Sequence, residues 1–148
     1  MSAASLALQK AMVAALTGDT AFSALVTGVF DTAPVGQALP FASFGTDIVS
    51  DWSHKTGEGR QHRVQLSIWA DGGDSVALRR TMAAAEEALA GLPAALDGHR
   101  LVSFRLARSL VLRDARGPDQ GVLEFRALTL KTDGKDNKWR LKRAVPSC

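Results

Sequence analysis

The side chains best suited to acid–base chemistry or metal binding in this sequence are its three histidines, His54, His62 and His99. None of them has a second histidine or a cysteine at a spacing that metal sites use. A serine nucleophile would need a sharp strand-to-helix turn such as G-x-S-x-G, and the sequence lacks that pattern. We therefore expect no catalytic residue, no cofactor and no bound metal.

Glycine and cysteine patterns lead to the same expectation. Residues 56–60, TGEGR, have a superficial likeness to a glycine-rich phosphate loop. A strand is expected to follow them, however, where a phosphate site needs a helix N-terminus. The single cysteine is Cys148, so neither an internal disulfide framework nor a thiolate cluster is possible within one chain.

Basic residues are concentrated near the C-terminal end. Residues 131–148 hold six Lys or Arg and two Asp, a net charge of +4. Since the whole chain carries +3, residues 1–130 carry −1. We divide the chain into a domain of residues 1–131 and a basic extension of residues 132–148. Such an extension can contact phosphates, an acidic protein surface or only solvent.

Four other side chains, Arg63, Trp69, Arg105 and Arg126, are candidates to share one face of a sheet. Arginines interleaved with aromatic rings can bind single-stranded nucleic acid by stacking. The sequence has no tyrosine, however, and lacks the aromatic platform of an RNA-recognition sheet. Polar strand faces otherwise meet water or another subunit, and the residues alone leave these alternatives open.

Length and hydropathy indicate one soluble domain. A chain of 148 residues is long enough to bury one substantial core. No apolar run approaches the roughly 20 residues that cross a bilayer. The N-terminal segment MSAASLALQKAMVAAL lacks the basic region of a secretory signal. We therefore expect synthesis in a cytoplasm and no membrane partner.

The N-terminal part is predicted to hold two helices and a short strand. Apolar residues recur every four positions among many alanines, which predicts a helix over residues 3–16. Asp19 is placed to cap a second helix over residues 20–26. A glycine then releases the chain into a strand at residues 29–30.

Two prolines, Pro34 and Pro40, keep the next segment extended, because proline fixes φ near −65° and disfavours helix at the residue before it. A strand over residues 41–49 is expected directly afterwards. The polar segment 50–61 is longer than an ordinary hairpin loop and contains Trp52. Because an exposed tryptophan is unfavourable, this side chain either folds back on the domain or enters the surface of a partner.

Residues 62–70 alternate between apolar and polar side chains, which predicts a strand with its apolar residues on one side. Asp74 can cap a helix over residues 75–90, which Gly91 ends. The buried stripe of this helix is predicted to be Leu78, Met82, Ala85 and Leu89.

The last elements are predicted to form a long hairpin. A turn at residues 96–99 leads into a strand over residues 100–113, whose apolar positions begin with Val102. A change of parity near residues 110–112 indicates a bulge or bend. A strand over residues 121–131 returns beside it. The whole order predicts an α+β domain, with a largely antiparallel sheet and helices packed on one face.

Several segments in sequence order resemble one protein family. They are ALTGDTAFSALVTG, VFDTAPVGQALPFASFG, HRVQLSIWADGGD before a helix ending in ALAGL, and GVLEFRALTL. Together they resemble the tail-terminator, or tail-completion, proteins of long-tailed bacteriophages and of gene transfer agents. The resemblance covers nearly all of the domain and ends near Leu130.

The resemblance implies a structural virion protein and not an enzyme, located at the head-proximal end of the tail. Such proteins form a homo-oligomeric ring, typically a hexamer, that docks on the last layer of the tail tube protein. The other face of the ring meets a head–tail connector or stopper protein. DNA passes through the central channel without sequence-specific binding.

Under this resemblance, Trp52, His54 and Arg60 are candidate contacts between rings or subunits, because a long loop anchored on strands can reach beyond its own domain.

The basic extension is a second candidate contact. It is expected to lie along a neighbouring subunit, with Trp139 as its apolar anchor beside Arg140, Lys142 and Arg143. The family resemblance gives no warrant for this part. The alternative function is a small nucleic-acid-binding module that uses the basic extension.

Overall fold

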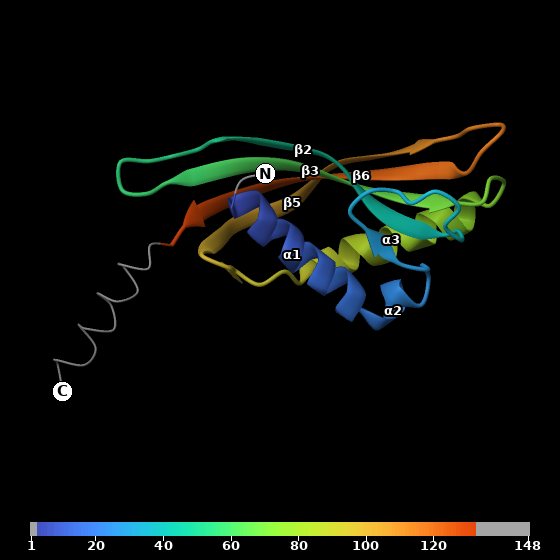
Figure 1. Cartoon of the computed structure of the whole chain (residues 1–148), viewed down its shortest axis with the longest axis horizontal. Helices are drawn as coiled ribbons and strands as arrows, with labels where there is room; N and C mark the ends of the chain where they lie inside the picture. Colours follow the sequence, from blue (N-terminus) through green and yellow to red (C-terminus); the bar gives the residue numbers. More distant parts are fainter. Residues whose placement is uncertain (1–2, 133–148) are drawn as a thin grey trace.

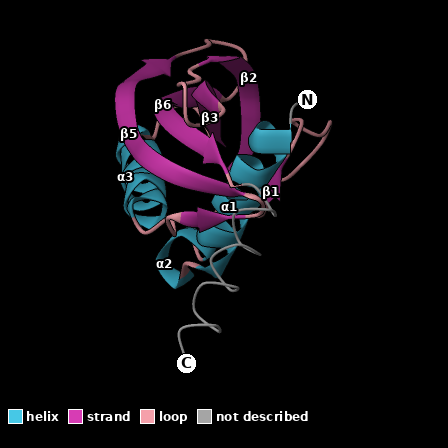
Figure 2. Ribbon diagram, turned by 90° about the vertical axis from the view of Figure 1, so that its left-hand side faces the viewer, coloured by secondary structure: helices cyan, strands magenta, loops and turns pink. Residues whose placement is uncertain are grey.

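The computed structural model describes residues 3–132, which form one curled six-stranded sheet with helices on one of its faces (Figures 1 and 2). The helices are α1 (Ala3–Gly18), α2 (Thr20–Ser23) and α3 (Ser75–Ala90). The strands are β1 (Val29–Phe30), β2 (Phe41–Asp51), β3 (Gly59–Ala70), β4 (Ala95–Leu96), β5 (His99–Leu112) and β6 (Asp119–Lys131). The predicted α+β class is confirmed.

The sheet has the strand order β1-β2-β3-β6-β5-β4. The pairing of β1 with β2 is parallel, and all the other pairings are antiparallel. The long central strands β3 and β6 pair without interruption from Gly59 opposite Leu130 to Ala70 opposite Asp119. Since β1 and β4 are very short, β2 and β5 form most of the two outer edges of the sheet.

Local sequence explains the long helix α3. The side chain of Asp74 accepts a hydrogen bond from the backbone N of Ala77 at 3.0 Å, as the capping prediction requires. Gly91 follows the last helical residue, and its backbone N–H bonds to the carbonyls of Ala88 and Leu89. The predicted bounds and the predicted buried stripe are both confirmed.

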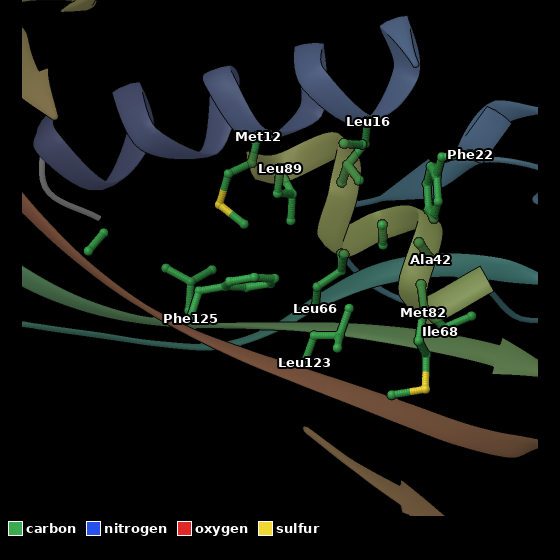
Figure 3. Close-up of a cluster of buried hydrophobic side chains, with 14 of the residues drawn as sticks. Met12, Leu16, Phe22, Ala42, Leu66, Ile68, Met82, Leu89, Leu123 and Phe125 are labelled. Atoms are coloured by element: carbon green, nitrogen blue, oxygen red, sulfur yellow. The ribbon is translucent and has the colours of Figure 1, made fainter. Parts of the chain in front are cut away.

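The core lies between the helices and one face of the sheet (Figure 3). Met12 and Leu16 of α1 point toward the sheet, where Leu66 and Phe125 lie beneath them. Phe104 of β5 stacks on Phe125, with ring centroids 4.9 Å apart. Burying such side chains stabilises the fold by roughly 1.5–3 kcal/mol each. The apolar side predicted for the strand at residues 62–70 is the buried side.

The second helix is shorter than predicted. Asp19 caps it as expected, accepting from the backbone N of Phe22 at 2.9 Å, but the helix ends at Ser23. The chain leaves the helix early because Thr27 is bonded to the segment that contains Pro34 and Pro40. Its backbone N donates to the carbonyl of Pro40 at 2.8 Å, and its hydroxyl donates to that of Ala38 at 2.7 Å.

The prediction for the inward residues of β5 is wrong at its start. Leu101 is buried, whereas Val102 is 44% exposed. The register with β6 shifts between Leu101 and Ser103 and again between Leu106 and Arg108. Two β-bulges therefore reset the parity, and both precede the predicted change at residues 110–112.

Candidate assembly surface

The polar segment between β2 and β3 is a hairpin whose tip projects past the start of α1 (Figure 1). The expected loop over residues 50–61 is wrong at both ends, because β2 continues to Asp51 and β3 begins at Gly59. Polar residues take strand conformation here because neighbouring strands supply their hydrogen bonds. Arg60 pairs with Asp51 on one side and with Thr129 of β6 on the other.

Backbone hydrogen bonds order the tip of this hairpin. The backbone N of Trp52 donates to the carbonyl of Gly59 at 2.9 Å. His54 and Gly57 exchange two further bonds, of 2.8 and 3.2 Å. The hydroxyl of Ser53 accepts from the backbone N of Gly59 at 3.2 Å. The predicted contact residues Trp52 and His54 therefore stand on a defined turn.

Trp52 folds back over its own hairpin and stays half-buried. Its ring meets the His54 ring edge to face, with centroids 4.5 Å apart and planes at 70°. Gly59 makes room for it, since a Cβ at that position would lie 2.9 Å from Cε3 of Trp52. Of the two alternatives for Trp52, folding back on the domain is observed.

Two ion pairs lie within the hairpin, and a third joins it to the end of β6. Arg60 contacts Asp51 at 3.1 Å and Glu58 at 2.9 Å, and Lys131 lies 3.8 Å from Glu58. The backbone N of Lys131 also donates to the carbonyl of Glu58 at 2.8 Å. Partly exposed pairs contribute at most about 1 kcal/mol each. Their effect here is to hold the position of the tip relative to the sheet.

A buried polar pair beneath the hairpin was missed by the sequence reasoning. His62 is fully buried, and its Nε2 lies 2.8 Å from the hydroxyl oxygen of Thr129. Its Nδ1 has no partner among the described residues. Burial lowers the pKa of His62, the charges of His99 and Arg60 lower it further, and Asp47 opposes them. The alternation from His62 to Val64 could have placed this side chain on the buried face.

This histidine is not part of a metal centre of the described chain. Within residues 3–132, no group of three or more His, Cys, Asp or Glu side chains could hold a metal ion. His54 and His99 are not among the buried side chains, and His99 Nδ1 lies 2.9 Å from the carbonyl oxygen of Asp97. The arrangement is one of structural polar contacts around the hairpin.

The sheet ends in two open strand edges, on β2 and β5, at its opposite sides (Figure 2). Within the described chain, β1 pairs with β2 only at Ala42 and Ser43. Likewise, β4 pairs with β5 only at His99 and Arg100. Residues 45–51 and 102–112 therefore present backbone groups that no neighbouring strand within residues 3–132 pairs, and open edges of this kind can pair with other chains.

Large apolar side chains are exposed on both open edges. They are Ile48 on β2, 54% exposed, and Val102 and Leu112 on β5, 44% and 49% exposed. The edges are also interrupted, since the pairing register shifts between Phe44 and Asp47 and at the two bulges of β5. Pairing with a further strand would be confined to the regular stretches between these interruptions.

The basic side chains proposed for the C-terminal extension, Arg140, Lys142 and Arg143, lie outside the described residues, as does Trp139.

Residues 10–130 match the family described as tail completion protein gp17. The chain belongs to this family. A chain from the virion of a native gene transfer agent particle is 31% identical, with a TM-score of 0.77. That match covers 88% of this chain and 99% of that chain. The structure of bacteriophage SPP1 gp17 protein is 20% identical, with a TM-score of 0.59. It covers 90% of this chain and 94% of that chain, and shows a shared fold. None of the curated proteins matches the chain.

The resemblance found in the sequence is thus confirmed. As a tail completion protein, the chain is a structural component of the tail of a phage or phage-like virion. None of the described helices is long and apolar enough to span a membrane.

Proposed function

We propose that this tail completion protein closes into a ring, with six copies as the expected number, on the last layer of the tail tube. The ring stops addition of tube protein on one side and meets a head–tail connector or stopper protein on the other. DNA passes through its centre without sequence-specific binding. The protein has no catalytic step in this proposal, because its work is done by interfaces.

The observation that carries the ring is the pair of unlike open edges on β2 and β5. A contact between two different surfaces of the same chain is heterologous, and its repetition gives a closed ring or a filament. Within one copy, β2 and β5 run in opposite directions, since three successive antiparallel pairings separate them. When copies are related by an axis along the strands, β2 of one copy lies antiparallel to β5 of the next.

Register supports the same arrangement. One line of paired residues crosses the sheet at a single level. It runs from Ile48 of β2 to Arg63 of β3, then to Arg126 of β6 and Arg105 of β5. A ring without an axial step brings Ile48 of the next copy to the level of Arg105. The exposed apolar side chains at the two edges then lose water on pairing, which contributes about 25 cal/mol per Å² of apolar area.

The hairpin tip is suited to a contact along the axis. It lies at one end of the strands, and the turn between β5 and β6 lies at the other end (Figure 1). With the axis along the strands, Trp52, His54 and Arg60 are therefore directed toward the next layer of the tail or head. The basic extension of residues 132–148 is proposed to reach a neighbouring copy.

The ring can be tested by measuring the mass of the full-length protein in solution and on purified tails. We expect a ring for the wild type, and a shift toward monomer for Ile48→Lys, since a charge blunts an open edge. The matched control is Val76→Lys on α3, where the replaced side chain is 65% exposed and lies on a helix. It should leave the ring intact.

Two outcomes separate the parts of this proposal. A wild-type protein that is monomeric both in solution and on tails refutes the ring. A ring that Ile48→Lys leaves unchanged refutes edge pairing but not the ring. Truncation after residue 131 tests the extension separately, because unchanged assembly would remove it from the interface.

A further inference from the structure

Three arginines stand side by side on the sheet face opposite the helices. Arg63 of β3 pairs with Arg126 of β6, which pairs with Arg105 of β5. All three side chains are exposed. They alternate with the inward residues Val64, Phe125 and Leu106, and thus project away from the helical layer seen in Figure 1. We call these three residues the arginine row.

The charges in the arginine row are not compensated within the described chain. Neighbouring strands lie about 4.8 Å apart, and like charges directly opposite one another are destabilising. Neither Arg63 nor Arg105 has a hydrogen-bond or ion-pair partner among residues 3–132. Arg126 donates only to the amide oxygen of Gln61, at 3.3 Å. The row therefore keeps three positive charges that an external anion would stabilise.

Among the described strand residues, the acidic side chain on this face is Glu124, and it already has hydrogen-bond partners. Glu124 accepts from Nε of Arg108 at 3.2 Å and from the amide of Gln65 at 3.5 Å. Two uncharged polar side chains flank the row on β3, since Gln61 and Gln65 lie two residues to either side of Arg63. An anion approaching the row thus meets donors and little repulsion.

We propose that the arginine row binds the phosphate backbone of DNA. Guanidinium groups bind phosphate oxygens through two parallel N–H donors, which makes arginine well suited to this ligand. The Trp69 ring is not placed to stack a base at the row, because it lies six residues from Arg63 along β3, where it stacks on Phe41 and its Nε1 donates to Ser43 at 2.9 Å. The contact is therefore to the backbone and independent of sequence.

This inference deepens the proposed function, on which it rests for the position of the DNA. The row runs across the strands, so in a ring whose axis lies along the strands it forms a band around the channel. A band of this kind meets the backbone at every rotation of the DNA about its axis. It would hold DNA in the channel without a preferred base sequence or rotational position.

The test is the salt dependence of binding to a short duplex DNA of mixed sequence by the full-length protein. The slope of log K against log salt is negative, and each lost phosphate contact reduces its magnitude by about 0.9. We expect Arg63→Gln with Arg105→Gln to reduce the magnitude of this slope by about 1.8 for each copy of the chain that contacts the DNA. The matched control is Arg79→Gln with Arg80→Gln, which removes two exposed arginines from α3. It should change the slope much less.

A slope that is equal in the two double variants overturns the inference. So does a row variant that binds DNA normally but fails to assemble, because the face would then be a protein interface. Arg126→Gln provides a single-site check, and melting temperatures establish that each variant is folded. Measuring the oligomeric mass of the same samples keeps the two proposals apart, since a monomeric wild type would refute the ring whatever the slope.

Discussion

Replacing Gly59 with alanine is expected to destabilise the hairpin between β2 and β3. A Cβ at this position would lie 2.5 Å from the carbonyl oxygen of Trp52, 2.9 Å from its Cε3 and 3.1 Å from Cδ2 of Leu130. The first contact is with backbone, which cannot move aside as the end of a flexible side chain can. That same backbone is held by the 2.9 Å bond from Trp52 N to Gly59 O.

The magnitude follows from overpacking. Forcing an extra methyl group into a filled site costs typically 1–3 kcal/mol, because the backbone or neighbouring side chains must shift. We expect Gly59→Ala to lower the free energy of unfolding by about that amount. Gly57→Ala is the matched control, since its Cβ would meet only Cδ2 of Leu130, at an ordinary 3.8 Å. It should change stability by no more than about 0.5 kcal/mol.

Urea unfolding of the full-length variants, followed by far-ultraviolet circular dichroism, measures both free energies. Tryptophan fluorescence adds a probe of the hairpin tip, because Trp52, one of three tryptophans in the chain, lies there. Equal stabilities of the two variants would refute the reasoning. That result would mean that the hairpin tip rearranges freely and that Trp52 is not fixed against Gly59.

Two further changes test the buried histidine and the cap of α3. Burial lowers the pKa of His62 below 6.5, so the unfolded chain binds more protons than the folded one as pH falls through that value, and stability is lost. His62→Gln should weaken this loss between pH 7.5 and pH 5.5, measured as the melting temperature in thermal unfolding. Parallel curves of melting temperature against pH for the wild type and the variant would contradict the assignment of this loss to His62. Asp74→Ala removes the bond to the backbone N of Ala77 and should cost about 0.5–2 kcal/mol. Asp74→Asn keeps an acceptor and should cost less, so equal losses in chemical denaturation would argue against capping.

Features that depend on residues close in sequence were predicted well. The helix from Ser75 to Ala90 has its predicted bounds, because a cap, a helical period and a terminal glycine lie within the segment itself. The strand over residues 62–70 was recognised for the same reason, since alternation is a local property. The extension of this strand back to Gly59 was not predicted, because Arg60 and Gln61 become strand residues only through their partners in β2 and β6.

Bulges were the least predictable feature of the sheet. The inward residue near the start of β5 is Leu101 and not Val102, since the register with β6 shifts there. The apolar and polar alternation of β5 indicated a change of parity only near residues 110–112. A bulge places an extra residue opposite one partner residue on β6, so its position is defined by the pairing of the two strands. The exposure of Val102 on an open edge is a direct result.

Family membership and the lack of catalytic residue patterns were accessible from the sequence, because short segments in a fixed order carry that information. The fold class followed from local periodicity and from the lengths of the connections. Tertiary structure alone decided that Trp52 lies over Gly59 and that β2 and β5 are the open edges. It also placed Arg63, Arg126 and Arg105 in one row. The physical reason is that strand pairing joins residues far apart in the chain, and its register is set by the packing of the whole sheet.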